Sequence, residues 1–162
     1  MSLSPAQLVT LKTAILDDPV LNAYPQNSDG AYNMAIFLDQ PVTPDFIVWK
    51  TSVDPDQVMK DGMDWTRVDN LSVGKARIWD WMTRLGTFNP TKINIRSGID
   101  AAWVGTAADL AVRATVYAHC KRSATRAEKV LKDSGAGTDA DPAIMGVEGK
   151  LLPQDVYDAR NG

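Results

Sequence analysis

Prolines that follow a helix-capping residue recur along this 162-residue chain and divide it into short helical segments. A capping residue followed by proline is typical of a helix start, because the fixed φ of proline suits the first helical position. The pattern occurs at Ser4-Pro5, Thr43-Pro44, Asp54-Pro55 and Asn89-Pro90. Proline within a helix removes a backbone hydrogen bond, so each of these pairs marks a new element. The chain is therefore expected to be mainly α, folded as a helical bundle.

Two amphipathic helices are expected in the first forty residues. Ser4 and Gln7 have the spacing of a capping box, and apolar residues then recur at helical spacing until Asp17-Asp18-Pro19. A second apolar stripe begins near Ser28 and is closed by Pro41. These two helices are predicted to form a hairpin.

The middle of the chain contains one ambiguous segment and two further helices. Residues 46–49 are rich in β-branched and aromatic side chains but follow a helix-start pair, so a short strand near 46–50 and a helical turn both fit. Asp54-Pro55 is expected to open a short helix that stops at Gly62. Asn70 or Ser72 is expected to cap the next one, which ends at Gly86.

One long central helix is expected from about Ser97 to Lys121, or as far as Lys132. Its predicted packing seam alternates spacings of four and three: Ile99, Trp103, Thr106, Leu110, Arg113, Tyr117 and Cys120. An alanine stripe runs beside this seam. A helix with two usable faces is either central in a bundle or shared with a neighbouring subunit.

The C-terminal part is expected to be a flexible arm. Residues 1–133 are predicted to form the helical domain, and residues 134–150 are polar and glycine-rich, which is typical of a linker. Residues 151–162 form a short amphipathic tail whose apolar side chains are Leu151, Leu152, Val156 and Tyr157. Such a tail either docks on a partner or packs back onto its own domain.

No residue pattern in the chain indicates catalysis, a cofactor or a metal site. His119 is the single histidine, and on a helix the neighbouring Cys120 would point about 100° away from it, which is poor geometry for a nucleophile and its base. One cysteine excludes an intrachain disulfide and agrees with a reducing compartment. An enzyme is therefore not expected.

Charge is distributed unevenly along the chain. The formal net charge is −3, but residues 67–132 contain twelve Lys/Arg and five Asp/Glu, so this stretch carries +7 and the remainder −10. The basic residues Lys121, Arg122, Arg126 and Lys129 are the best candidates for a surface that meets DNA or an acidic neighbouring subunit; on one helix, the last three would share a face. A solvated helix face is the plainer interpretation.

Three of the five tryptophans, Trp65, Trp79 and Trp81, are concentrated in one short region. Core packing accounts for most buried tryptophans, although tryptophan also dominates binding hot spots. One or two of these side chains are candidates for a subunit interface. The sequence contains neither a signal-peptide layout nor an apolar run long enough for a membrane span, so no membrane association is expected.

Two segments of the chain resemble a family of tailed-bacteriophage proteins encoded among head and tail morphogenesis genes. They are residues 3–8 (Leu-Ser-Pro-Ala-Gln-Leu) and, above all, residues 61–81 (from Asp61-Gly62-Met63-Asp64-Trp65 to Trp79-Asp80-Trp81). The similarity extends through Ala124. It implies a virion protein in the neck, made in the host cytoplasm during assembly.

Among neck components, the helical ones are head–tail adaptors, and the resemblance therefore implies an adaptor. Such an adaptor forms a homo-oligomeric ring, of about twelve copies, between the portal and the tail. Its partners would be the portal protein and neighbouring neck or tail proteins, with DNA as no more than non-specific channel contents. The alternatives are a DNA-binding regulator or packaging accessory protein, and a tail-assembly chaperone.

Overall fold

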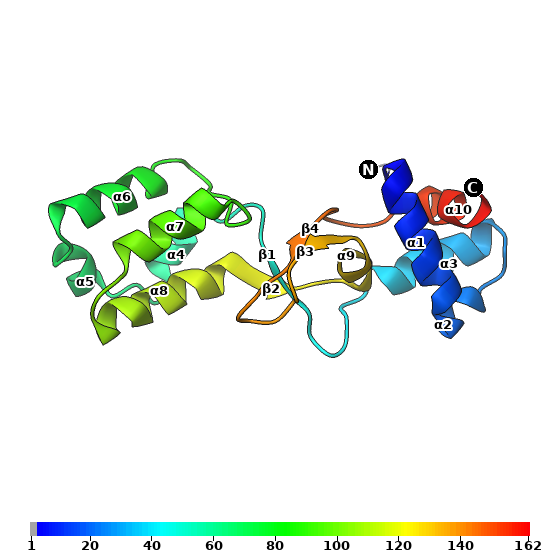
Figure 1. Cartoon of the computed structure of the whole chain (residues 1–162), viewed down its shortest axis with the longest axis horizontal. Coiled ribbons are helices and arrows are strands. Elements are labelled where there is room, and N and C mark those ends of the chain that lie inside the picture. The colour runs from blue at the N-terminus through cyan, green and yellow to red at the C-terminus, as the bar shows by residue number, and fades with distance from the viewer. Residues whose placement is uncertain (1–2) are drawn as a thin grey trace. The chain divides into compact units, whose positions relative to one another are not determined.

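The computed structural model of the chain describes residues 3–162 and is built mainly from helices (Figure 1). The helices are α1 (Pro5–Asp17), α2 (Pro19–Asn22), α3 (Ser28–Leu38), α4 (Pro55–Lys60), α5 (Trp65–Asp69), α6 (Val73–Thr83), α7 (Ile93–Ala102), α8 (Ala107–Cys120), α9 (Arg126–Val130) and α10 (Pro153–Asn161). Two small sheets accompany them: β1 (Ile47–Trp49) with β2 (Lys121–Ser123), and β3 (Lys132–Ser134) with β4 (Ile144–Met145). The mainly α class expected from the capping pattern is confirmed.

The described residues divide into two compact units. Residues up to Val48 and Ser123–Gly162 form unit 1, and Trp49–Arg122 form unit 2. The chain passes between the units twice, once in β1 and once in β2. No boundary of this division falls at residue 133 or 150, because residues 123–162 pack with the N-terminal segment.

The core of unit 1 is formed where α10 packs against both α1 and α3. The expected N-terminus of α1 is confirmed, with Ser4 and Gln7 joined in a reciprocal capping box. Leu11, Ile15 and Met34 are fully buried together with Val156 from α10. A short helix is not stable alone, and the apolar area that these three helices bury together stabilises them.

The expected flexible C-terminal arm is not confirmed, because its apolar side chains belong to the unit 1 core. Leu151 is 4% exposed and Val156 0% exposed. Asp155 is also buried, and its Oδ1 accepts a hydrogen bond from the Leu3 amide at 3.1 Å. The Leu151 amide donates to Asp39 Oδ1 at 3.0 Å. The tail thus packs back onto its own unit, which was the alternative left open by the sequence.

The glycine-rich segment 134–150, expected to be a linker, is folded, because it supplies Ser134 of β3, the connecting turn and all of β4 in a hairpin. β3 pairs antiparallel with β4, and the Gly137 carbonyl accepts a hydrogen bond from the Ile47 amide at 2.8 Å. Gly137 has φ +76°, and a Cβ at this position would lie 2.0 Å from the Phe46 ring. Glycine is required here both by the backbone conformation and by the aromatic ring packed on it.

Residues 47–49 form a strand rather than a helical turn. The Ala143 amide donates to the Ile47 carbonyl at 2.9 Å, and the Ala124 amide donates to the Phe46 carbonyl at 2.8 Å. Val48 is fully buried. Backbone partners on both sides satisfy this segment, which is why its β-branched composition prevails over the preceding Thr43-Pro44, where no helix forms.

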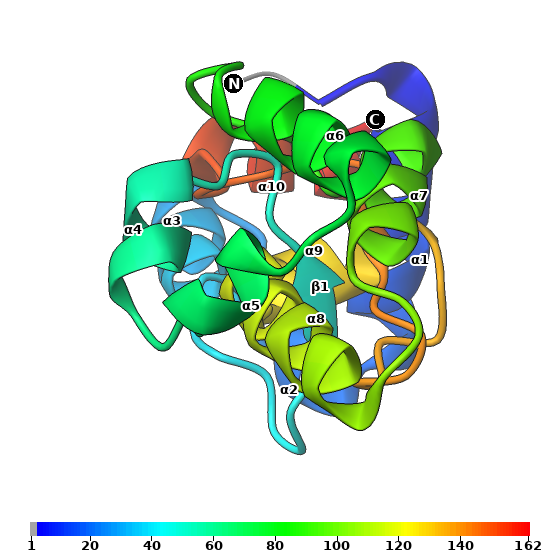
Figure 2. The ribbon, with the colours of Figure 1, turned by 90° about the vertical axis from the view of Figure 1, so that its left-hand side faces the viewer.

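Unit 2 consists of α4 to α8, and α6 lies alongside α7 (Figures 1 and 2). Trp79 from α6 meets Trp103 edge to face, with ring centroids 5.3 Å apart, and both rings are buried. On α8, Asp109 is 5% exposed and pairs with Arg67 of α5 at 2.7 Å. This hydrogen bond with the Arg67 guanidinium lowers the pKa of Asp109 to about 2.

The expected single long helix is not confirmed, because the chain breaks between α7 and α8. Gly105 has φ +127°, and Thr106 then caps α8 in a reciprocal box with Asp109. The break shifts the helical phase, so α8 buries Val112 and Val116. Leu110 of the predicted seam is 42% exposed. The Thr-x-x-Asp spacing at 106–109 was the local signal of this start.

Candidate functional site

The four candidate basic residues do not share one helix face. Lys121 and Arg122 lie in β2, within unit 2, whereas Arg126 and Lys129 lie on α9, within unit 1. Arg122, Arg126 and Lys129 would share a face only on one continuous helix, and the chain does not form one there. The reason is local: Lys121 adopts extended backbone after Cys120, and a new capping box from Thr125 to Glu128 starts α9.

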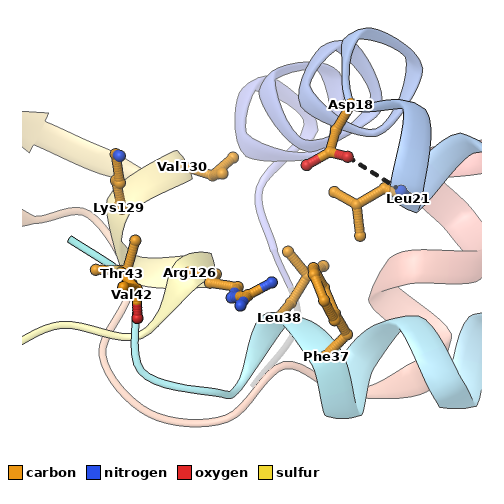
Figure 3. A pocket seen from close by; sticks show the side chains of 9 residues that line it. All are labelled: Asp18, Leu21, Phe37, Leu38, Val42, Thr43, Arg126, Lys129 and Val130. Carbon is orange, nitrogen blue, oxygen red and sulfur yellow. Dashed lines mark hydrogen bonds between the residues drawn. The ribbon is translucent and has the colours of Figure 1, made fainter. Parts of the chain in front are cut away.

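Arg126 and Lys129 line a cavity of about 400 Å³ in unit 1 (Figure 3). Its apolar wall consists of Leu21, Phe37, Leu38, Val42 and Val130, and its remaining polar side chains are Asp18 and Thr43. These residues come from α2 and the residue preceding it, the end of α3 and the segment after it, and α9. Sequence reasoning proposed the two cations but missed the cavity, because no local pattern connects segments so far apart.

The Arg126 side chain is oriented by an aromatic contact. Its guanidinium carbon lies 3.8 Å from the centroid of the Phe37 ring, and Figure 3 shows the group pointing toward Phe37 and Leu38. A cation over an aromatic face is attracted by the ring quadrupole and keeps its edge N–H groups available. Lys129 is exposed, with its Nζ 5.7 Å from the centroid of the Phe46 ring.

Asp18 supplies the one carboxylate of this cavity. Its Oδ1 accepts hydrogen bonds from the Val20 amide at 2.8 Å and the Leu21 amide at 3.3 Å, which caps α2. In Figure 3 it lies on the opposite side of the cavity from Lys129. The lining thus combines two cations, an aliphatic wall and a carboxylate already engaged by backbone amides.

The candidate tryptophans divide into buried and exposed members. Trp79 is 3% exposed and belongs to the unit 2 core, whereas Trp65 is 58% exposed and Trp81 66% exposed. Trp81 lines a hollow of about 470 Å³ on α6, together with Leu71, Val73, Ala76, Arg77 and Asp80. Val73 and Leu85 are exposed in the same region of the sequence. We call Trp65, Val73, Trp81 and Leu85 the exposed apolar set of unit 2.

The candidate docking residues of the tail divide in the same way. Leu151 and Val156 are buried in unit 1, as described above, while Leu152 is 45% exposed and Tyr157 39% exposed. Pro153, Gln154 and Tyr157 line a small hollow with Ser28 and Ala31. Of the four predicted residues, Leu152 and Tyr157 are therefore the two whose side chains reach the surface of the unit.

Neither His119 nor Cys120, the base and nucleophile considered in the sequence, is arranged for catalysis. His119 Nε2 lies 3.0 Å from the Asp61 carbonyl oxygen, and Cys120 is fully buried. Burial raises the pKa of the Cys120 thiol to about 12, which suppresses the reactive thiolate. Within residues 3–162, no cluster of three or more His, Cys, Asp or Glu side chains is arranged to hold a metal ion. No helix in this range is long and apolar enough to cross a bilayer.

Comparison with known proteins adds no relative: no protein family, no curated protein and no solved structure matches this chain.

Proposed function

We propose that this chain is a structural protein of a phage particle, a head–tail adaptor that forms a ring between the portal and the tail. The proposal starts from the resemblance carried by residues 3–8 and 61–81. The mainly helical fold supports an adaptor among the neck components that the resemblance implies. In this function the protein acts by binding neighbours, and no chemical step is required of it.

The observation that carries the proposal is the exposed apolar set of unit 2. Val73 is 76% exposed and Trp81 66% exposed, and both belong to the segment that carries the resemblance. Exposed tryptophan and aliphatic side chains in one short region are typical of a protein interaction site, since leaving them in water forgoes the free energy of burial. We infer that a neighbouring neck subunit covers them in the particle.

The charge of the two units supports contacts between copies. Unit 2 contains eleven Lys/Arg and eight Asp/Glu, a net charge of +3, whereas unit 1 contains six Lys/Arg and twelve Asp/Glu, a net charge of −6. A ring places the same two surfaces against each other at every interface. Opposite net charges would favour contact of unit 2 with unit 1 of the next copy.

The tail would contact the portal through its exposed side chains. Leu152 and Tyr157 are accessible, while Leu151 and Val156 hold α10 on its unit. Docking of this kind needs no free arm. A flexible arm would require α10 to leave its core in the particle, at the cost of exposing the buried Val156.

Quantitative mass spectrometry of purified phage particles, from the phage that encodes this chain, tests the proposal. We expect the protein in finished particles at the copy number of the portal protein. Its absence from particles, together with abundance in infected cells, would refute the adaptor function. The remaining functions would then be a DNA-binding regulator, a packaging accessory or an assembly chaperone. Binding to duplex DNA that weakens with added salt would indicate a regulator or packaging accessory and not a chaperone.

A matched pair of variants tests whether the exposed apolar set of unit 2 is needed for incorporation into particles. Trp81→Ala removes the most exposed tryptophan of unit 2, and Tyr32→Ala removes an aromatic side chain that is 56% exposed in unit 1. We expect Trp81→Ala to lower incorporation into particles by ten-fold or more, a typical loss for an interface hot spot of about 2 kcal/mol. Tyr32→Ala should leave incorporation unchanged. Equal incorporation of both variants would exclude Trp81 from the interface.

A further inference from the structure

The cavity of unit 1 combines unpaired positive charge with an aliphatic wall. None of the salt bridges within residues 3–162 uses Arg126 or Lys129, and neither side chain makes a hydrogen bond there. Arg126 is nevertheless held in place, because its guanidinium stacks on Phe37 at 3.8 Å. A guanidinium fixed by stacking loses little rotamer freedom when its N–H groups bind an anion.

We propose that this cavity binds a segment of a partner polypeptide in which a carboxylate is next to an aliphatic side chain. The carboxylate would accept hydrogen bonds from Arg126 and lie near Lys129, a geometry in which charge-assisted bonds are strong. The aliphatic side chain would fill the space against Leu21, Leu38 and Val130. The proposal rests on the cavity alone and does not depend on the adaptor function.

The openness of the site favours a polypeptide over a small molecule. Lys129 and Thr43 are exposed, while Asp18 and Arg126 are half-buried. Sites for small molecules usually bury most of the surface of their ligand, which this lining does not do. A peptide segment laid across the opening needs only one or two side chains to enter, and a cavity of about 400 Å³ accommodates them.

Charge also disfavours nucleic acid at this site. The lining has two cations, and Asp18 stands opposite Lys129, with the exposed Asp17 preceding it in the chain. A phosphate backbone is uniformly anionic and would be repelled on that side. A peptide with a single carboxylate can place its charge near Arg126 and present its apolar side chain toward Leu21.

The test is a titration of the ¹⁵N-labelled full chain followed by ¹H–¹⁵N correlation spectra. The probe is the peptide acetyl-Ala-Leu-Glu-Leu-Ala-amide, and its neutral match carries Gln in place of Glu. We expect the Glu peptide to bind in the millimolar range or tighter and to shift the amides of Phe37, Leu38, Val42 and Val130. The Gln peptide should bind about ten-fold more weakly, because it lacks the charge-assisted bonds.

Three variants complete the design. Arg126→Gln and Lys129→Gln should each weaken binding of the Glu peptide, by about ten-fold for Arg126 and less for the exposed Lys129. Lys150→Gln, which removes an exposed cation of unit 1 outside the cavity, should leave binding unchanged. The dispersion of the spectra reports whether the loss of Arg126 stacking disturbs the fold. If it does, Lys129→Gln still tests the role of charge in the cavity, because Lys129 is exposed.

Several results would overturn the proposal. These are no shift at millimolar peptide, equal affinity for the Glu and Gln peptides, shifts confined to amides away from the cavity, or equal weakening by Lys150→Gln. A short DNA duplex that shifts the cavity amides when the Glu peptide does not would also overturn it, in favour of a nucleic-acid site.

Discussion

Replacing Val156 with alanine tests whether the C-terminal helix is part of the unit 1 core. Val156 is fully buried on α10 among Leu11, Ile15 and Met34. The substitution removes two buried methyl groups, worth about 1.6 kcal/mol of transfer free energy, and the cavity left behind adds about 1 kcal/mol. We therefore expect the free energy of unfolding to fall by about 2–3 kcal/mol.

Urea unfolding followed by far-UV circular dichroism is the appropriate assay, since all five tryptophans lie between residues 49 and 103 and report on unit 2. With a slope of about 1.5–2 kcal/mol per molar urea, the unit 1 transition should shift down by about 1–2 M. Val9→Ala is the matched control, because Val9 is 65% exposed on α1. It should change stability by no more than about 0.5 kcal/mol.

Equal midpoints for Val156→Ala, Val9→Ala and the unchanged protein would refute the packing argument. Such a result would mean that α10 contributes no buried surface in solution, and the flexible arm expected from the glycine-rich segment would be restored. Hydrogen exchange localises the effect. Val156→Ala should speed exchange in α10 and in the faces of α1 and α3 that contact it.

Three further predictions concern pH, backbone conformation and thiol chemistry. Arg67 lowers the pKa of Asp109 to about 2, so the ionised carboxylate stabilises the fold above its usual pKa of 3.8. This stabilisation should be lost as the pH falls from about 4 toward 2. Between these pH values, the urea midpoint of Arg67→Gln should therefore fall less than that of the unchanged protein. Gly137→Ala should lower the melting temperature, through a strained φ and a clash with Phe46 worth about 1–3 kcal/mol; an unchanged melting temperature would contradict that packing. The buried Cys120 thiol, with its pKa raised to about 12, should react slowly with Ellman's reagent in the native protein and rapidly in urea; fast native reaction would show that the site opens.

Several elements were predictable from local sequence. The bounds of α1 follow from the Ser4–Gln7 capping box and from Pro19, and α4 follows from Asp54-Pro55. These signals act through hydrogen bonds and steric restrictions within a few residues, so the surrounding fold has little influence on them. The predicted long helix does not form because the Thr106–Asp109 capping box starts a new helix, although the seam spacing continues across residues 103–106.

The candidate site was predictable only in part. The sequence identified Arg126 and Lys129 as candidate basic residues, and it grouped Arg122 with them only if one helix continued through residues 122–129, which the strand at 121–123 prevents. Nothing local indicates that Phe37 lies beneath Arg126. Likewise, the tryptophans near residue 80 are alike in sequence, yet Trp79 is buried and Trp81 is 66% exposed.

The sequence by itself determined where α1, α3, α4 and α6 start and that the fold is mainly α, because capping, proline geometry and helical periodicity are short-range effects. The tertiary structure decided that Val156 is buried while Tyr157 is exposed, that the glycine-rich segment forms a hairpin against Phe46, and that a cavity brings Asp18 near α9. Those outcomes depend on which surfaces meet across long separations in the chain. Their free energy comes from burial shared between elements, which no single segment encodes.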